Sequence, residues 1–129
     1  RERFYQTIKT ITHEMHVRFC NIDYDREMML VAEIRENGGR RLIGMGGFNI
    51  EADFRKCEFS ILVHDDFQGQ GLAHKMIDIL IGIADEKGLE EFYGYIEPQN
   101  RKMVRLCEKL GMSAEKSPDD LTRVSLRLR

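Results

Sequence analysis

The segment of the chain best suited to chemistry is residues 58–73, EFSILVHDDFQGQGLA, where a predicted strand runs into a short loop and then a helix. Gly69 and Gly71 let an anion approach the loop backbone without a Cβ in the way. The first turn of the helix adds unpaired N–H groups at its positive end. These features predict a site for phosphate oxygens, and an ordinary strand-to-helix turn is the alternative interpretation.

The loop matches neither of two common nucleotide-binding patterns. It lacks the Gly-x-Gly-x-x-Gly spacing of dinucleotide-binding proteins and the Gly-Lys-Ser/Thr of a P-loop. The sequence therefore favours a phosphate-bearing ligand other than a dinucleotide or a nucleoside triphosphate.

Hydrophobic patterns predict the elements that position this loop. The strand before it covers Lys56–Val63, where Cys57 and Phe59 alternate with Glu58, so that one face is core and the other carries a carboxylate. The helix after it covers Gly71–Lys87. The other predicted elements are a helical segment over residues 4–19, an antiparallel hairpin of Met28–Ile34 and Arg41–Ile50, a strand at Glu91–Ile96, a helix at Asn100–Leu110 and a final antiparallel strand at Leu121–Leu128.

Two details of these elements bear on topology. The strand-helix-strand succession over residues 56–96 predicts a parallel strand pair. Gly44, Gly46 and Gly47 lie inside the second strand of the hairpin and indicate a bulge or a close backbone approach.

Two motifs at matching separation resemble those of the GNAT superfamily of N-acetyltransferases. Gln68, Gly71 and Ala73 fit its pyrophosphate signature, Gln/Arg-x-x-Gly-x-Gly/Ala, and Asn100 opens a helix that ends in Leu-Gly-Met, like its second signature. The resemblance implies acetyl-CoA as the acetyl donor. The cofactor-binding residues that it implies are Ile61, Leu62, Val63, Gln68, Gly69, Gln70, Gly71, Leu72, Ala73, His74 and Asn100.

The same resemblance implies an α/β fold of GNAT type. Its sheet is mixed and mostly antiparallel, with a central splayed parallel strand pair flanked by helices. The 129 residues have the length of one domain. The chain opens Arg-Glu-Arg-Phe without an initiating methionine, so we expect a fragment of a longer protein in which the first strand and first helix of the family precede Arg1.

A finer resemblance lies in Arg3–Tyr5 and Asn21–Ala32. These segments are similar to the GNAT domain of bacterial protein lysine acetyltransferases, which acetylate and silence AMP-forming acyl-CoA synthetases. The resemblance implies a protein partner with an exposed lysine, of which an acyl-CoA synthetase is an example.

The chemistry of acetyl transfer to lysine requires a base, because the amine is mostly protonated at neutral pH. Glu58 matches the catalytic glutamate of the lysine acetyltransferase group and is the predicted base; a solvated strand residue is the alternative. Cys107 replaces the tyrosine that usually acts as general acid in the family. Tyr93 and Tyr95 could supply that proton, or pack as strand aromatics.

Composition bears on three further questions: binding to nucleic acid or membrane, binding of a metal, and the redox state of the compartment. The formal net charge of −2 gives no general attraction to nucleic acid or anionic membrane. The residues His13–His16 lack the spacing and third ligand of a zinc site, so no metal is expected. Three widely spaced cysteines favour a reducing cytoplasm over a disulfide framework.

Two other functions stay open at this level. A small-molecule amine acetyltransferase would share the cofactor motifs, with its acceptor pocket formed by the early segments. A regulatory module that binds acyl-CoA without turnover would fit the missing tyrosine.

Overall fold

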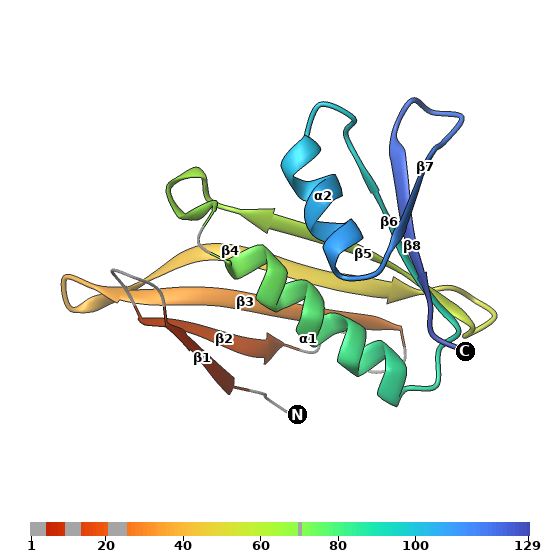
Figure 1. Cartoon of the computed structure of the whole chain (residues 1–129). Coiled ribbons are helices and arrows are strands. Elements are labelled where there is room, and N and C mark those ends of the chain that lie inside the picture. The colour runs from red at the N-terminus through yellow and green to blue at the C-terminus, as the bar shows by residue number, and fades with distance from the viewer. Residues whose placement is uncertain (1–4, 10–13, 21–25, 70) are drawn as a thin grey trace.

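The apolar-polar alternation in the middle of the chain builds a β-sheet. In the computed structural model, which describes residues 5–9, 14–20, 26–69 and 71–129, the described strands form one sheet in the order β1-β2-β3-β4-β5-β6-β8-β7 (Figure 1). The elements are β1 (Tyr5–Lys9), β2 (Glu14–Cys20), β3 (Glu27–Glu36), β4 (Gly39–Ile50), β5 (Lys56–Val63), η1 (Asp65–Phe67), α1 (Leu72–Glu86), β6 (Glu91–Ile96), α2 (Arg101–Lys109), β7 (Ser113–Lys116) and β8 (Thr122–Arg127).

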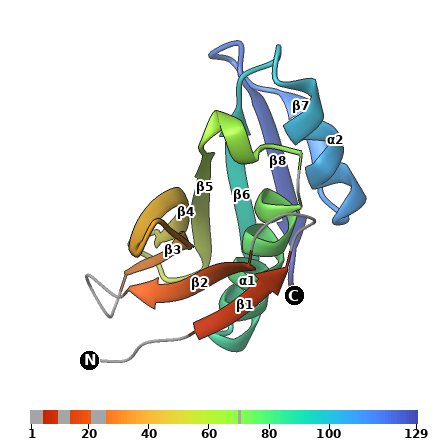
Figure 2. The same ribbon diagram turned by 90° about the vertical axis from the view of Figure 1, so that its left-hand side faces the viewer.

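The topology confirms the predicted α/β fold with a mixed sheet. Strands β5 and β6 pair in parallel, and the other neighbouring strands pair antiparallel. The predicted bounds of β5 and β6 agree with the structure, and the predicted hairpin is β3 and β4. Figure 2 shows the twist of the sheet, with β1 and β2 running across the direction of β5, β6 and β8.

Both helices lie on one face of the sheet, in front of it in Figure 1. Helix α1 packs on β4 and β5, and α2 packs on β7 and β8. The helical stripe predicted for α1 is confirmed, and Gly88, with φ of +79°, follows the helix at its C-terminal end. The buried residues of α1 are Leu72, Met76, Ile77, Leu80 and Ala84.

The opposite face of the sheet, called the open face below, carries alternate residues of the two central strands. On β5 these are Glu58, Ser60 and Leu62, all exposed, while Cys57 and Phe59 between them are buried. On β6 the open-face residues are Tyr93 and Tyr95, whose rings contact edge to face at 6.0 Å. The predicted placement of Glu58 opposite the core is therefore confirmed.

The parallel pair β5 and β6 separates partway along its length. Its register joins Lys56 to Glu91, Cys57 to Phe92 and Glu58 to Tyr93, and the pairing stops there, although β5 continues to Val63 and β6 to Ile96. The predicted splay of this pair is thus present. It begins directly after Glu58.

The glycines of β4 mark an irregular and crowded stretch. The register between β3 and β4 shifts at Ala32/Glu33, which leaves Ile43 as an extra residue beside Gly44. A Cβ on Gly44 would lie 3.1 Å from the Leu62 carbonyl oxygen and 3.3 Å from Leu72 Cδ2. Both parts of the glycine prediction, a bulge and a close approach, are confirmed.

One prediction, near the start of the chain, was wrong, and one strand, near its end, was missed. Residues 5–9 and 14–20 are strands rather than a helix, and Phe4 and Ile11 lie outside the described residues. Met15 and Val17, two positions apart on β2, are both fully buried, so the period that the fold uses is two. Strand β7 was not predicted at all.

Gly94 on β6 leaves room for the packing of Phe59 and Phe92 on the face of the sheet that the helices cover. A Cβ there would lie 2.8–2.9 Å from three carbons of the Phe59 ring, which stacks on Phe92 at 4.7 Å. We expect Gly94→Ala to lower the free energy of unfolding by about 1–3 kcal/mol, measured by urea denaturation. Gly82→Ala, in open space on α1, is the control and should stabilise by roughly 0.5–1 kcal/mol. An unchanged midpoint for Gly94→Ala would contradict the packing argument.

Neither described helix is long and apolar enough to cross a membrane.

Candidate active site

A cleft of about 230 Å³ opens where β5, the loop after it, the start of α1 and the start of α2 meet. It lies beside the splay of the parallel pair. The residues that line it are Ile61, Leu62, Val63, Phe67, Gln68, Gly69, Gly71, Ala73, Asn100, Lys102, Met103 and Leu106. Most of the residues predicted to bind the cofactor are therefore brought together in one place.

The loop of the cleft has the backbone geometry that its glycines permit. Gly69 and Gly71 have φ of +79° and +84°, and Gly71 is the N-cap of α1 without a side-chain cap. The helix bonding starts with Lys75 N–H to Gly71 O at 3.0 Å. The N–H groups of the first turn have no carbonyl of their own helix to bond, so they suit phosphate oxygens.

Two predicted cofactor residues that the structure describes, Leu72 and His74, do not line the cleft with their side chains. Leu72 is 1% exposed and packs in the core, which leaves only its backbone for a ligand. His74 is exposed on α1 outside the lining. Gln70 lies outside the described residues.

Gln68 and Asn100 each have a structural bond within the cleft. The Gln68 amide Nε2 donates to Val63 O and to Asp65 Oδ1, each at 3.2 Å, which ties the loop to the end of β5. Asn100 caps α2, since Met103 N–H donates to Asn100 Oδ1 at 3.3 Å.

Lys102 was missed in the sequence and brings a cation to the cleft lining. Its position two residues after the Asn100 cap, near the start of a predicted helix, was the available signal. A lysine ammonium can pair with a phosphate oxygen. The cleft thus offers both a cation and unpaired N–H groups to a ligand that carries phosphates.

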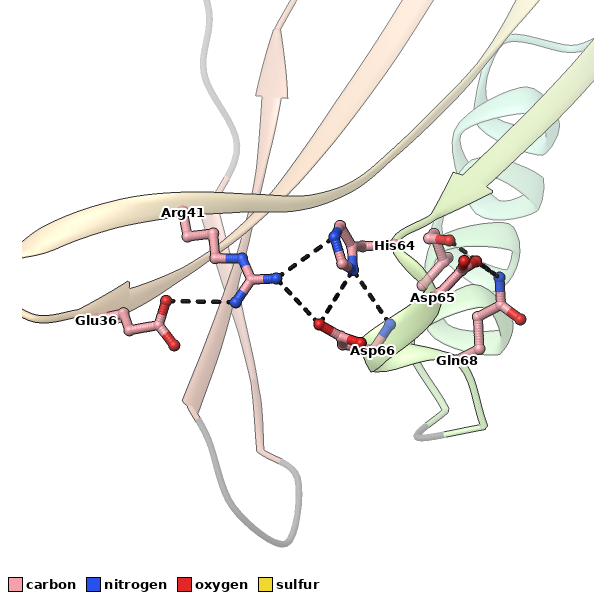
Figure 3. Close-up of polar contacts among 7 residues, drawn as sticks. Glu36, Arg41, His64, Asp65, Asp66 and Gln68 are labelled. Atoms are coloured by element: carbon pink, nitrogen blue, oxygen red, sulfur yellow. Dashed lines mark hydrogen bonds and ion pairs between the residues drawn. The ribbon is translucent and has the colours of Figure 1, made fainter.

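Behind the loop, a cluster of charged residues holds η1 to the β3–β4 hairpin (Figure 3). Arg41 donates to Glu36 Oε1 at 3.4 Å and to Asp66 Oδ2 at 3.3 Å. Its guanidinium carbon also lies 5.4 Å from the ring centre of buried Phe67. His64 Nδ1 accepts from Asp66 N–H at 3.1 Å, so in the neutral ring Nε2 carries the proton and the 3.4 Å approach of Arg41 to it is a contact.

Arg41 lines no part of the cleft, so its effect on ligand binding must pass through the loop. We expect Arg41→Ala to weaken acetyl-CoA binding by about two- to fivefold, because exposed ion pairs contribute little each. Isothermal titration calorimetry measures this, and Arg40→Ala, which removes the neighbouring exposed arginine, is the control. Equal affinity of wild type and Arg41→Ala would show that the cluster does not position the loop.

On the open face, Glu58 is exposed and stands between Asn49 of β4 and Tyr93 of β6 in the register of the sheet. The Tyr93 hydroxyl donates to Glu51, the residue after β4. Burial raises the pKa of the Tyr93 phenol well above its usual range, and the charges of Glu51 and Glu58 raise it further. Sequence reasoning missed Glu51, because its link to Tyr93 depends on the register of three strands.

The cysteines of the helix face have a packing role. Cys107 is fully buried on α2, and burial raises the pKa of its thiol to about 11. Cys57 is also fully buried, with a pKa raised by burial to about 12. Cys107 is therefore a small core residue. In the described part of the chain, no three His, Cys, Asp or Glu side chains gather to hold a metal ion.

Comparison with known proteins assigns the chain to one family. The acetyltransferase (GNAT) domain family matches residues 2–113. Acetyltransferase PA5475 of Pseudomonas aeruginosa is 32% identical over 126 residues, which cover 98% of this chain and 68% of that protein.

Solved structures agree with this assignment. The structure of yncA from Salmonella typhimurium with its cofactor acetyl-CoA has a TM-score of 0.68 and 30% identity, covering 80% of this chain and 65% of that chain. Spermidine N-acetyltransferase from Vibrio cholerae shares the fold, with a TM-score of 0.67 and 23% identity over 81% of this chain and 66% of that chain. The chain belongs to the GNAT family of acetyltransferases, enzymes whose acetyl donor is acetyl-CoA.

Proposed function

We propose that this domain transfers an acetyl group from acetyl-CoA to the ε-amine of a protein lysine by direct attack, with Glu58 as the base. One observation carries the proposal. Glu58 is the exposed carboxylate at the last paired position before β5 and β6 separate, with the acetyl-CoA cleft beside the same splay.

The residues around the splay have distinct roles in this reaction. The loop at Gly69 and Gly71, with Lys102, holds the phosphates, and the unpaired backbone edges of β5 and β6 hold the arm that carries the thioester. Acetyl-CoA supplies a carbonyl carbon that an amine can attack. Glu58 removes a proton from the acceptor ammonium, directly or through water.

The transfer balances with these groups and solvent water. A bond forms between the lysine nitrogen and the acetyl carbon, and the bond from that carbon to the CoA sulfur breaks. The lysine ammonium loses two protons. Glu58 takes the first and passes it to solvent, and the second leaves the nitrogen for water once the nitrogen–carbon bond has formed. The departing thiolate takes one proton from water, which reaches the exposed face, so the products are the amide, the CoA thiol and one proton in solvent. Cys107 is buried and has no part in this step.

The exposure of the open face around Glu58 supports a protein substrate. Ser60 is exposed beside Glu58, and Leu62 is 68% exposed. A lysine that projects from another protein can reach such a surface. The resemblance of Asn21–Ala32 to lysine acetyltransferases supports the same acceptor class.

A small polyamine is the second candidate acceptor. The fold is shared with a spermidine N-acetyltransferase, and Glu51 and Glu58 place two carboxylates on the open face that would attract a polycation.

The test incubates an AMP-forming acetyl-CoA synthetase with acetyl-CoA and either wild type or Glu58→Gln, followed by peptide mass spectrometry. We expect acetylation at a specific lysine that disappears with the variant. If spermidine is acetylated in a parallel assay and the synthetase is not, the small-amine function replaces the protein one. Acetylation that persists with Glu58→Gln would remove Glu58 as the base.

A further inference from the structure

We infer that Glu51 binds the acceptor's ammonium group and that Tyr93 positions Glu51 for this task. The inference rests on the proposed function, since it divides the acceptor site between a binding carboxylate, Glu51, and a proton-removing one, Glu58. No sequence motif assigns a role to Glu51, and the sequence suggests Tyr93 only as a proton donor or a packing aromatic.

The Tyr93 side chain is a fixed donor. It is 7% exposed, and its hydroxyl donates to Glu51 Oε2. The guanidinium carbon of Arg123 lies 4.4 Å from the centre of its ring, and the Tyr95 ring contacts it edge to face. A ring held on two sides cannot turn its hydroxyl away from Glu51 without losing these contacts.

The protonation state of Tyr93 suits this role. Burial raises the pKa of the phenol above its usual range, so the hydroxyl keeps its proton at neutral pH. A lysine or arginine partner would neutralise the charge of the Glu51 carboxylate. A neutral tyrosine orients the carboxylate and leaves its negative charge in place. The carboxylate is therefore both fixed and available to a cation.

The register of the sheet places Glu51 beside Glu58. Glu51 N–H donates to Lys56 O at 2.8 Å, so the β4–β5 pairing extends to Glu51. Asn49 pairs with Glu58, and Glu51 follows two positions later on the same face. Such diagonal neighbours have Cα atoms roughly 7–8 Å apart, a spacing that lets one amine bind at Glu51 within reach of Glu58.

Two cations of the open face, Lys56 and Arg123, lie near a different carboxylate, that of Glu91. Lys56 Nζ lies 3.9 Å from Glu91 Oε1, and Arg123 Nη1 lies 3.3 Å from Glu91 Oε2. Neither Glu51 nor Glu58 forms an ion pair with any residue that the structure describes. Their charges are free to meet a cationic acceptor.

The experiment measures steady-state kinetics with a capped lysine, N-acetyl-lysine methylamide, which carries one charge. We expect Glu51→Gln to raise the acceptor KM by roughly ten- to hundredfold and to leave kcat within a fewfold of wild type. Tyr93→Phe should raise KM in the same sense by a smaller factor. Glu86→Gln at the end of α1, which also removes one exposed charge but lies on the face of the sheet that the helices cover, should leave both constants unchanged.

The double variant tests whether Tyr93 acts through Glu51. If it does, Glu51→Gln/Tyr93→Phe has the same KM as Glu51→Gln, because the hydroxyl has no carboxylate left to hold. Independent, additive increases in KM would overturn the positioning role of Tyr93. An unchanged KM in Glu51→Gln, or a fall in kcat alone, would overturn the binding role of Glu51.

A binding measurement separates these outcomes from failure of the proposed function. The dissociation constant of capped lysine for the CoA-loaded protein, from NMR titration, does not require turnover. We expect Glu51→Gln to weaken it by the same factor as KM, and equal affinity would overturn the inference even if no acceptor is acetylated. A loss of activity seen only in Glu58→Gln concerns the role of Glu58 as base and leaves the inference on Glu51 untouched. Failure to acetylate a synthetase would overturn only the proposal of a protein acceptor.

Discussion

Glu58→Gln is expected to lower kcat for acetyl transfer by roughly 10²- to 10⁴-fold, the contribution of a positioned base. The amide keeps the size of the side chain and cannot take a proton. Because Glu58 is exposed and lies outside the cleft lining, acetyl-CoA affinity and the unfolding midpoint should stay at their wild-type values. Release of CoA thiol, followed with a chromogenic disulfide, measures kcat.

Glu86→Gln at the end of α1 again serves as the matched charge control and should keep full activity. A Glu58→Gln variant with wild-type kcat would show that the acceptor amine loses its proton to another group or to water. A variant with low kcat and equally weakened acetyl-CoA binding would mean that Glu58 supports the cleft instead of the chemistry.

Gly71→Val is expected to weaken acetyl-CoA binding by roughly ten- to hundredfold. Gly71 has φ of +84°, a conformation that valine adopts only with strain, so the loop must move or the helix start must distort. Apart from the neighbours of Gly71 in the chain, no atom of the described residues lies within 4 Å of a Cβ built there, so the valine side chain would project into open space at the loop that we propose holds the phosphates. Calorimetric titration of acetyl-CoA measures the effect.

The control for backbone strain is Gly88→Val at the other end of α1. Gly88 has φ of +79° and equally open surroundings, but lies far along the helix from the cleft. Both variants should lose stability, and only Gly71→Val should lose acetyl-CoA affinity. If the two variants bind equally well, the loop at Gly71 does not hold the donor.

The central part of the fold could be predicted because local pattern and tertiary structure agree there. In β5, alternation of Cys57 and Phe59 with Glu58 is the pattern of a strand with one buried face. The first twenty residues differ, because apolar residues three and four apart suggest a helix while β2 pairs along β3 and buries Met15 and Val17. Pairing with a neighbouring strand overrides a local preference of this size.

Strand β7 shows the opposite case, in which the sequence carries no pattern. Ser113–Lys116 has one partly buried residue among exposed ones, and its strand conformation comes from pairing with β8. Such a segment has no periodicity of its own to read.

The candidate site likewise contains residues that the sequence predicted and residues that it did not. Gly69, Gly71 and Asn100 lie in contiguous motifs whose geometry follows from local rules, and the structure brings them together in the cleft. Glu51 and Tyr93 are 42 positions apart and meet only because β4, β5 and β6 are neighbours in one register. No pattern in the sequence reports such a pair.

The short ladder between β5 and β6 has a consequence for stability. The sheet consists of a larger part, β1–β5, and a smaller part, β6–β8–β7, which share only three paired positions, all at one end. Acetyl-CoA bound between the separated edges of β5 and β6 would supply hydrogen bonds that these edges lack and would connect the two parts of the sheet. Resistance of this domain to unfolding would then rise and fall with the supply of acetyl-CoA, which couples the lifetime of the protein to the metabolite it consumes.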